Sequence, residues 1–313
     1  MRRAALLLAL VMVACGGSGG GAPTPGPRPD GRTTIGDQPA TTSTTGLPAA
    51  TLLAAGDIAS CSSTGDEATA ALLDARPNAQ VATLGDNVYE SGTATEFANC
   101  YDPTWGRQKA RTHPAIGNHE YGVFRAGGYF GEFGAAAGES PLGWYSYELG
   151  QWHIVVLNSN CEQIGCALGG TQETWLRADL AAHPNLCTLA VWHHPRFSSG
   201  TTHGSSATVG PLYTALFDMG VDVLLTGHEH NYERFAPLNP AGVPDDVRGV
   251  REFVVGTGGV SHYPFGPPLP GSQVRNDDTF GILALTLRTT SYQWQFVPVA
   301  GKSFTDSGST NCH

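Results

Sequence analysis

The most constraining feature of this sequence is that its apolar runs repeatedly end in short clusters of Asp, Asn and His. The clusters read GDI, GDNVY, GNHE, HHPRF and GHEH, and each is expected at the carboxyl end of a strand. Open α/β sheets bind their ligands at such ends, where loops converge and the sheet keeps them rigid. The pattern therefore favours an α/β fold with one polar site assembled from distant segments.

The apolar runs predict a mixed sheet structure. A run at 50–59, a helical pattern at 67–75 and a second run at 79–87 predict a β-α-β unit. Two runs at 144–150 and 152–160 predict a hairpin. Further strands are expected at 187–195, 221–230, 251–259, 280–289 and 291–299, and helices at 171–183, with Thr171 as N-cap, and 211–219. Parallel and antiparallel strands with intervening helices predict two packed sheets flanked by helices.

The start of the chain has the features of an exported protein. Residues 1–14 place two arginines before an apolar run, which predicts a signal peptide too short to remain as a membrane-spanning helix. Cys15 follows a segment that resembles a bacterial lipobox, with Met12 where Leu is usual. We expect a lipid on Cys15 to anchor the chain outside the cytoplasm, in the cell envelope; an ordinary signal peptide with a chance cysteine is the alternative.

The next segment is poor in residues that a core could bury. Residues 16–49 are rich in Gly, Pro, Ser and Thr, and such a composition cannot offset the ordering entropy of a fold. Residues 15–49 are therefore expected to be the lipidated cysteine and a flexible linker. Residues 50–313 remain for a single catalytic domain with a substantial core.

The remaining six cysteines are even in number, and disulfides are expected in a chain that leaves the cytoplasm. Cys161 and Cys166 enclose a short loop and are the first expected pair. Sequence proximity favours Cys61 with Cys100, which leaves Cys187 for Cys312; other pairings stay open. No two cysteines have the C-x2-C spacing of a zinc finger.

The charge of the chain excludes one class of partner. Its formal net charge is -10, and its 17 basic residues are dispersed, so no basic stripe could neutralise a nucleic-acid backbone. A small anionic substrate is compatible with this charge if local metal cations dominate the site. The sequence makes no prediction of the oligomeric state.

The polar clusters also carry the chemistry of metal ligands. A lone Asp after a strand is ordinarily a turn or capping residue, and a lone surface His is ordinarily hydrated. His228 and His230 lie two apart, so in an extended segment their imidazoles point to the same side. Here all five strand ends offer Asp, Asn, His or Tyr. If these were ordinary turns, all five would have to carry metal-ligating residues by chance, so together they favour a metal site.

The order Asp, Asp-x-x-Tyr, Asn-His, His, His-x-His resembles the calcineurin-like metallophosphoesterases and, within them, the purple acid phosphatases. The resemblance covers about residues 51–260 and implies a β-sandwich of two sheets with helices on its outer faces. It also implies two metal ions that share one carboxylate. The implied ligands are Asp57, Tyr89 and His230 for the first metal, Asn118, His193 and His228 for the second, and Asp86 for both.

The sequence departs from the family pattern at two places. The usual GDxG around the first aspartate is here GDIA, with Ala59 in place of glycine, which puts the backbone shape of that loop in question. The family's V-x-x-H is here Ala190 to His193, with Ala190 in place of valine, and the adjacent His194 competes with His193 for the role of ligand. His193 is preferred because Pro195 then matches the family's H-x-P spacing.

The ligand types imply which metals are bound. A phenol with a pKa near 10 loses its proton readily only to a strongly polarising cation, so Tyr89 implies Fe(III) and a purple or pink protein. The second site, with two imidazoles, an amide oxygen and a shared carboxylate, suits a divalent metal such as Zn, Fe(II) or Mn.

The resemblance implies an acid phosphatase-type hydrolase, in which a metal-bound hydroxide attacks the phosphorus of a small-molecule phosphate monoester. His119, beside Asn118, matches the family's phosphate-contacting histidine, and His203 resembles the second one; an exposed loop histidine is the alternative for His203. Competing hypotheses are a phosphodiesterase of the same superfamily and a catalytically inactive, anchored binding module.

Other features are expected to have ordinary roles. The GTGG turn at 256–259 is expected to shape the pocket near His230 rather than to bind phosphate as a P-loop. The remaining histidines are expected to lie in strands, helix ends, loops or the tail, with no catalytic role; these are His113, His153, His183, His262 and His313.

Overall fold

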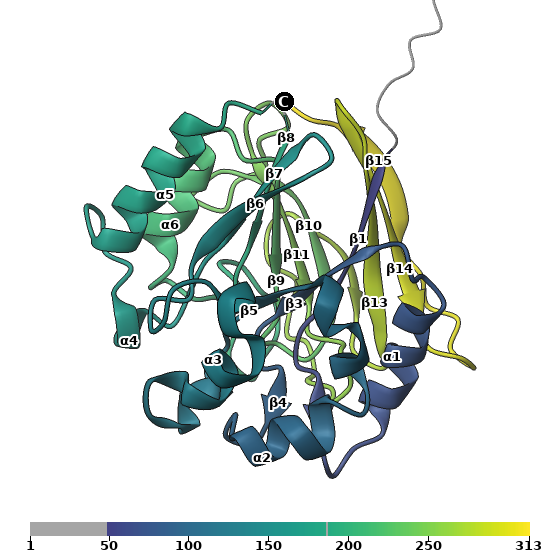
Figure 1. Ribbon diagram of the computed structural model, residues 1–313. Helices are drawn as coiled ribbons and strands as arrows, with labels where there is room; N and C mark the ends of the chain where they lie inside the picture. Colours follow the sequence, from purple (N-terminus) through teal and green to yellow (C-terminus); the bar gives the residue numbers. More distant parts are fainter. Residues whose placement is uncertain (1–48, 186) are drawn as a thin grey trace, which may run out of the picture. The chain divides into compact units, whose positions relative to one another are not determined.

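The computed structural model describes residues 49–185 and 187–313. The predicted signal peptide, Cys15 and all but the last residue of the predicted linker lie outside these residues. Two packed sheets form the centre of the described part, as the strand labels in Figure 1 show. The predicted two-sheet α/β sandwich is therefore confirmed.

The first sheet has the strand order β15-β14-β13-β1-β3-β5. Its strands are β1 (Ala50–Ala55), β3 (Gln80–Leu84), β5 (Thr112–Ala115), β13 (Gly281–Leu287), β14 (Ser291–Pro298) and β15 (Ser307–Asn311). Strands β1, β3 and β5 run parallel to one another, and β13 joins β1 antiparallel. The carboxyl ends of β1, β3 and β5 therefore lie at one edge of this sheet.

The second sheet has the order β12-β10-β11-β9-β8-β7-β6. Its strands are β6 (Tyr145–Leu149), β7 (Trp152–Val156), β8 (Cys187–Val191), β9 (Val223–Thr226), β10 (Tyr232–Leu238), β11 (Val250–Val255) and β12 (Ser272–Asn276). Strands β6 and β7 form the predicted hairpin, and β7, β8, β9 and β11 are parallel. Two short strands, β2 (Ala59–Ser60) and β4 (Val88–Tyr89), pair in parallel beside the sandwich.

Helices α1 (Gly65–Asp74), α5 (Thr171–Ala182) and α6 (Gly210–Asp218) lie on the outer faces of the sheets. The shorter helices α2 (Ala94–Glu96), α3 (Gly127–Phe133) and α4 (Cys161–Ile164) lie in the connections between strands. Helices α5 and α6 lie beside the second sheet, and α1 lies beside the first (Figure 1). Single turns of 3-10 or π-helix connect these elements at Phe97–Tyr101, Trp105–Arg111, His119–Gly122, Phe124–Ala126 and Gly134–Ala137.

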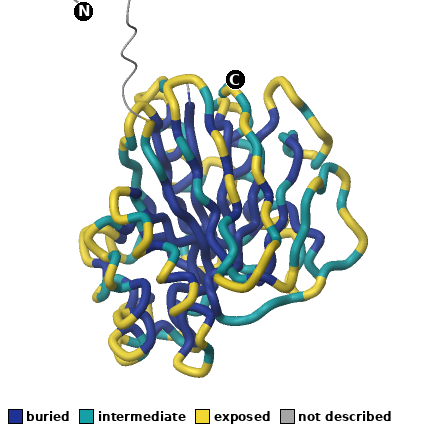
Figure 2. The backbone as a smooth tube through the Cα atoms, turned by 90° about the vertical axis from the view of Figure 1, so that its right-hand side faces the viewer, coloured by how far each residue is buried: buried dark blue, intermediate teal, exposed yellow. Residues whose placement is uncertain are grey.

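The central strands of the second sheet are buried on both faces, and their side chains alternate between two cores. Ile154 and Val156 of β7 pack in the core between the sheets, whereas Val155 packs against the helices. This is the period-two alternation of a strand. Leu176 of α5 and Leu216 of α6 supply the helix side of the second core. The strands therefore form a buried centre, and exposed positions gather in the loops around it (Figure 2).

Four strands of the two main sheets were not predicted from the sequence, because their apolar character is weak. Strand β5 has four residues, one of them proline, and β12 and β15 are short, polar strands at sheet edges. Strand β10 carries the charged residues Glu233 and Arg234, which find polar partners inside the fold. Glu233 accepts hydrogen bonds from Ser199, and Arg234 forms an ion pair with Asp306.

The prediction that Thr171 caps its helix is wrong. Gly170 occupies the cap position, and Thr171 is the first helical residue. Glu173 takes over part of the capping role, since its Oε2 accepts a 3.0 Å hydrogen bond from the N–H of Gly169. A carboxylate in the first turn also suits the positive end of the helix.

All three expected disulfides are present: Cys61–Cys100, Cys161–Cys166 and Cys187–Cys312. The last one joins β8 of the second sheet to the segment after β15 of the first, across a sequence separation of 125. It therefore links the two halves of the sandwich covalently. Among the described residues, no helix has the length and apolar character needed to cross a bilayer.

Candidate metal centre

The predicted ligands come from the loops after parallel strands of both sheets. Asp57 follows β1, Asp86 follows β3 and Asn118 follows β5, all in the first sheet. His193 follows β8 and His228 follows β9 in the second sheet. The loops meet directly, because Nδ1 of His193 lies 2.8 Å from the carbonyl oxygen at the end of β3. One site is therefore built from the ends of both sheets.

Tyr89 lies at the centre of the first group of donors. Its hydroxyl oxygen lies 3.0 Å from Oδ1 of Asp57 and 3.0 Å from Oδ2 of Asp86, so its one proton can be donated to either carboxylate, and it lies 3.2 Å from Nε2 of His230. Nε2 of His230 is 3.3 Å from Oδ1 of Asp57. These four side chains thus direct their polar atoms at one point.

His193 lies at the centre of the second group. Its Nε2 is 3.1 Å from Oδ1 of Asn118, 3.2 Å from Oδ2 of Asp86 and 3.2 Å from Nδ1 of His228. The Oδ2 atom of Asp86 therefore belongs to both groups. All seven residues predicted as ligands are brought together, and Asp86 occupies the position expected of a shared carboxylate.

The charge of this cluster fits bound cations. Asp57 and Asp86 are almost completely buried, and within the described residues neither forms an ion pair with Lys or Arg. Burial, and then the two carboxylates, raise the pKa of the Tyr89 phenol well above 10. Burial alone would lower the pKa of His193, but Asp86 raises it to about 9. The site thus concentrates negative charge that metal ions would balance, and a tyrosinate there requires such a cation.

The backbone of the cluster is strained where ligands are placed. Asp57, Asp86 and His228 adopt left-handed φ values of 61°, 48° and 69°. Such conformations cost about 1–3 kcal/mol each in non-glycine residues and persist where the surroundings enforce them. Strain at three of seven predicted ligands indicates that the loops are shaped to aim these side chains.

The GTGG turn packs against the cluster, as expected. A Cβ atom added to Gly256 would lie 2.7 Å from Oδ2 of Asp57, so this close approach requires glycine. The turn also holds the Asp57 loop, because the N–H of Val260 donates to the carbonyl of Asp57 at 3.2 Å. Ala59, the departure from the family's glycine, lies in β2 and pairs with β4, a conformation that alanine adopts without strain.

The two adjacent histidines have different surroundings. His193 is fully buried and contacts both Asn118 and Asp86. His194 instead pairs its Nδ1 with the hydroxyl of Ser159 at 2.8 Å and packs its ring 4.3 Å from that of His228. This geometry supports His193 over His194 in the cluster.

The two histidines predicted to be catalytic flank the cluster. Nδ1 of His119 donates to the carbonyl of Glu90 at 2.6 Å, and its Nε2 is 3.9 Å from Oδ2 of Asp86. The ring of His203 stacks on that of His228 at 4.1 Å. Each imidazole is therefore a direct neighbour of a predicted ligand: His119 lies next to Asp86, and His203 lies next to His228.

Sequence reasoning missed two buried glutamates that stand inside the ligand motifs. Glu120 of GNHE accepts hydrogen bonds from the backbone N–H groups of Gly117 and Asn87, each at 2.7 Å. Glu229 of GHEH accepts from the N–H of His203 at 2.6 Å. Each carboxylate thus ties its own motif to a second loop of the site. Their position within ligand motifs was the available signal.

Two further residues that hold His230 carried no signal in the sequence. Its Nδ1 lies 2.7 Å from the hydroxyl of Ser261, and the ring of Tyr263 stacks on the imidazole at 3.8 Å. Partners of this kind fix the orientation and tautomer of a ligating histidine. They come from the loop after GTGG, which has no motif of its own.

A second group of histidines and carboxylates, here called the edge cluster, consists of Glu148, His153, Asp179 and His183. His153 is buried, with Nδ1 2.6 Å from Glu148 and Nε2 2.8 Å from Asp179. The rings of His153 and His183 stack at 4.3 Å with planes only 11° apart. Parallel stacked imidazoles cannot both direct a lone pair at one ion, so this cluster does not fit a metal.

The other histidines have the ordinary surroundings expected of them. His113 stacks on Tyr147 at 3.7 Å, and His262 stacks on Phe280 at 4.0 Å. Nδ1 of His313 lies 2.9 Å from Asp222. His113 and His313 make no hydrogen bond to the predicted ligands within the described residues, whereas His262 lies against the backbone of His230.

Comparison with known proteins agrees with this geometry. The family model described as calcineurin-like phosphoesterase matches residues 50–232. Acid phosphatase A of Cryphonectria parasitica is 27% identical over 202 residues, which cover 55% of this chain and 40% of that protein. Purple acid phosphatase 15 of Arabidopsis thaliana is 33% identical over 103 residues, covering 31% of this chain and 19% of that protein.

A solved structure shares the fold. The purple acid phosphatase PPD1 of yellow lupin superposes with a TM-score of 0.63 at 19% identity, over 83% of this chain and 53% of that one. The chain thus spans about half or less of the length of these three relatives. From the family match and the arrangement of its site, this chain belongs to the calcineurin-like phosphoesterases and is a purple acid phosphatase-like member of that family.

Proposed function

We propose that the chain hydrolyses phosphate monoesters at a dinuclear centre of Fe(III) and a divalent metal. The observation that carries this proposal is the convergence of seven buried or half-buried donors into two groups that share Asp86. Asp57, Tyr89 and His230 would hold Fe(III), and the other group would hold Zn, Fe(II) or Mn. When bound, the metals supply Lewis acidity, which lowers the pKa of water and neutralises charge on the phosphoryl oxygens.

The chain orients its carboxylates through backbone donors. Oδ2 of Asp57 accepts a 2.8 Å hydrogen bond from the N–H of His228, and Oδ1 of Asp86 accepts a 2.9 Å hydrogen bond from that of His119. Each aspartate thus keeps its other oxygen, Oδ1 of Asp57 and Oδ2 of Asp86, directed at Tyr89. This preorganisation is the chain's own contribution to metal and substrate binding.

His119 is the residue proposed to move a proton. Because its Nδ1–H is held by the carbonyl of Glu90, the nitrogen that faces the site is Nε2. A protonated His119 can donate from Nε2 to the leaving oxygen or to the phosphoryl group. His203, whose ring stacks on that of His228, is proposed as a second contact to the phosphate.

Turnover of a chromogenic monoester and its matching diester, each with and without a chelator, tests this function. We expect monoester hydrolysis to dominate and to be lost with the chelator. A strong preference for the diester would favour the phosphodiesterase alternative. Folded, metal-loaded protein that hydrolyses neither ester would favour the inactive binding module.

We also propose that the protein is exported and anchored outside the cytoplasm through a lipid on Cys15. Support comes from the three disulfides of the described residues, because such bonds persist in oxidising compartments. Membrane fractionation of the full chain and of Cys15→Ser tests the anchor. The wild type is expected with membranes and the variant in the soluble fraction; equal distribution would contradict the proposal.

A further inference from the structure

A cavity of about 320 Å³ opens beside the metal centre. Asn118 and His194 form its wall on the metal side, and Glu162, Gln163 and Thr208 lie among its other lining residues. Asn118 belongs both to the cavity and to the cluster of predicted ligands. A phosphoryl group held at the centre therefore has this cavity next to it, available for the alcohol part of the ester.

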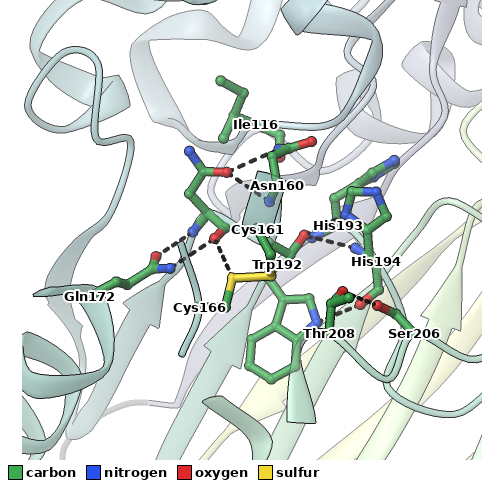
Figure 3. Close-up of a disulfide and its surroundings, with 12 residues drawn as sticks. Ile116, Asn160, Cys161, Cys166, Gln172, Trp192, His193, His194, Ser206 and Thr208 are labelled. Carbon is green, nitrogen blue, oxygen red and sulfur yellow. Dashed lines mark hydrogen bonds between the residues drawn. A yellow bond between two sulfur atoms is a disulfide. The ribbon is translucent and has the colours of Figure 1, made fainter. Parts of the chain in front are cut away.

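The wall that carries Glu162 is held rigidly. Figure 3 shows the Cys161–Cys166 disulfide, whose Cα atoms are 5.0 Å apart. It closes a short segment made of α4 and the turn after it, and this segment contains Glu162 and Gln163. Immediately before it, the N–H of Asn158 donates to Oε1 of Gln172 at 2.7 Å, and Nε2 of Gln172 donates back at 2.9 Å. The exposed side chain of Glu162 is therefore carried by a backbone segment that the disulfide and the Asn158–Gln172 hydrogen bonds hold in place.

Hydrogen bonds at Ser159 define what His194 offers to the cavity. The Ser159 hydroxyl oxygen accepts from the backbone N–H groups of His193 and His194, at 3.2 Å and 2.9 Å. Its one proton is then directed at Nδ1 of His194, 2.8 Å away. The neutral ring of His194 consequently carries its own proton on Nε2, which makes no hydrogen bond within the described residues. His194 is thus a hydrogen-bond donor on the metal side of the cavity.

The charges of the cavity restrict what it can bind. Glu162 is its one carboxylate, and no Lys or Arg is among the described residues that line it. A second phosphate or carboxylate on the substrate would need such a cation as partner. Apart from the disulfide sulfur of Cys161, the remaining lining groups are amides, hydroxyls and an imidazole, which suit hydroxyl and amine groups.

We infer that this cavity binds the alcohol part of the substrate and selects esters whose alcohol part is neutral or cationic over those that carry a second anion. Glu162 is the residue that sets this preference. The inference rests on the proposed phosphomonoesterase function and adds to it the substrate class.

Three esters of similar size test the inference: phosphoethanolamine, glycerol 3-phosphate and 3-phosphoglycerate, whose alcohol parts are cationic, neutral and anionic. We expect kcat/KM of the wild type to be lowest for 3-phosphoglycerate. Glu162→Gln should narrow the ratio of glycerol 3-phosphate to 3-phosphoglycerate by about threefold to tenfold, the range for one partly screened charge at short distance. Glu67→Gln removes the same charge from an exposed position on α1 and should leave the ratio unchanged.

A double variant, Cys161→Ser with Cys166→Ser, removes the disulfide that holds the segment carrying Glu162. Like Glu162→Gln, it should lower the ratio of kcat/KM for glycerol 3-phosphate to kcat/KM for 3-phosphoglycerate. Equal kcat/KM for the three esters would overturn the cavity assignment. So would an equal effect of Glu162→Gln and Glu67→Gln on the kcat/KM ratio of glycerol 3-phosphate to 3-phosphoglycerate. Either result would leave the monoesterase proposal intact. Absence of turnover for all three esters and for a chromogenic monoester, in folded and metal-loaded protein, would overturn both.

Discussion

The metal centre and the edge cluster are built from similar residue types and yet differ in what they can do. In the edge cluster, both nitrogens of His153 face carboxylates, and Asp179 also accepts a 2.8 Å hydrogen bond from Ser146. Its residues have ordinary backbone conformations. In the metal centre, Asp57, Asp86 and Tyr89 crowd together with only histidines as partners, on backbone that is strained at both aspartates.

The difference teaches that donor type alone does not make a metal site. Histidines and carboxylates that pair with one another satisfy their own charge and hydrogen bonds. Donors that converge with uncompensated negative charge need a cation to complete them. In this protein, left-handed backbone at predicted ligands occurs in the metal centre and not in the edge cluster.

The largest expected effect separates the two clusters by one matched substitution. Asp86→Asn should lower kcat by about a thousandfold or more, because it removes the shared carboxylate and with it several kcal/mol of metal-derived stabilisation. Asp179→Asn makes the same chemical change in the edge cluster and should leave kcat and metal content unaltered. Steady-state kinetics with circular dichroism as a folding check would measure both. An Asp86→Asn enzyme within tenfold of wild type would contradict the assignment.

The next effect concerns Tyr89, which has no counterpart in the edge cluster. Tyr89→Phe should abolish the visible absorption band expected of an Fe(III) tyrosinate, since the variant removes the phenolate oxygen. Activity should fall less than in Asp86→Asn, because Tyr89→Phe keeps the carboxylate of Asp86 that both groups of donors share. A visible spectrum of each protein at equal iron content makes the comparison. An unchanged band in the variant would show that another group produces the colour.

A smaller effect is expected at Glu120, which holds the loops of the metal centre. Glu120→Gln should lower the free energy of unfolding by about 1–3 kcal/mol, since an amide nitrogen replaces an acceptor that faces buried N–H groups. Urea unfolding with disulfides intact measures this change. Glu67→Gln is the matched control on the surface and should be nearly neutral. Equal stability of the two variants would refute a structural role for Glu120.

The smallest effect is the pH dependence of the edge cluster. Burial lowers the pKa of His153, but hydrogen bonds to Asp179 and Glu148 outweigh it and raise the pKa above 6.5. The folded protein therefore binds this proton more tightly than the unfolded chain. The stabilisation is complete below about pH 6.5 and is lost as the pH rises through the folded-state pKa.

Unfolding free energies of wild type and His153→Gln at pH 6 and pH 8 test this sign. Wild type should lose more stability than the variant between the two pH values. The difference should be a fraction of about 1 kcal/mol, because solvent screens the exposed partner Glu148. A larger loss in the variant would reverse the sign and contradict the assignment.

Much of the site could be predicted because its ligands stand in contiguous motifs after apolar strands. Asp57, Asp86 and His228 were identifiable for that reason, although their left-handed backbone was not. Ser261 and Tyr263 could not be predicted, since they reach His230 only through the fold. The same limit applies to strands: continuous apolar runs identified β7 and β9, whereas the polar strand β15 is held by its pairing with β14.

Elemental analysis of the purified, full-length protein tests the central claim most directly. If Asp86 joins two groups of donors, wild type should contain two metal ions per chain, one iron and one divalent, and Asp86→Asn should contain fewer than one. Folded, active wild type with one metal ion or none per chain would contradict the account.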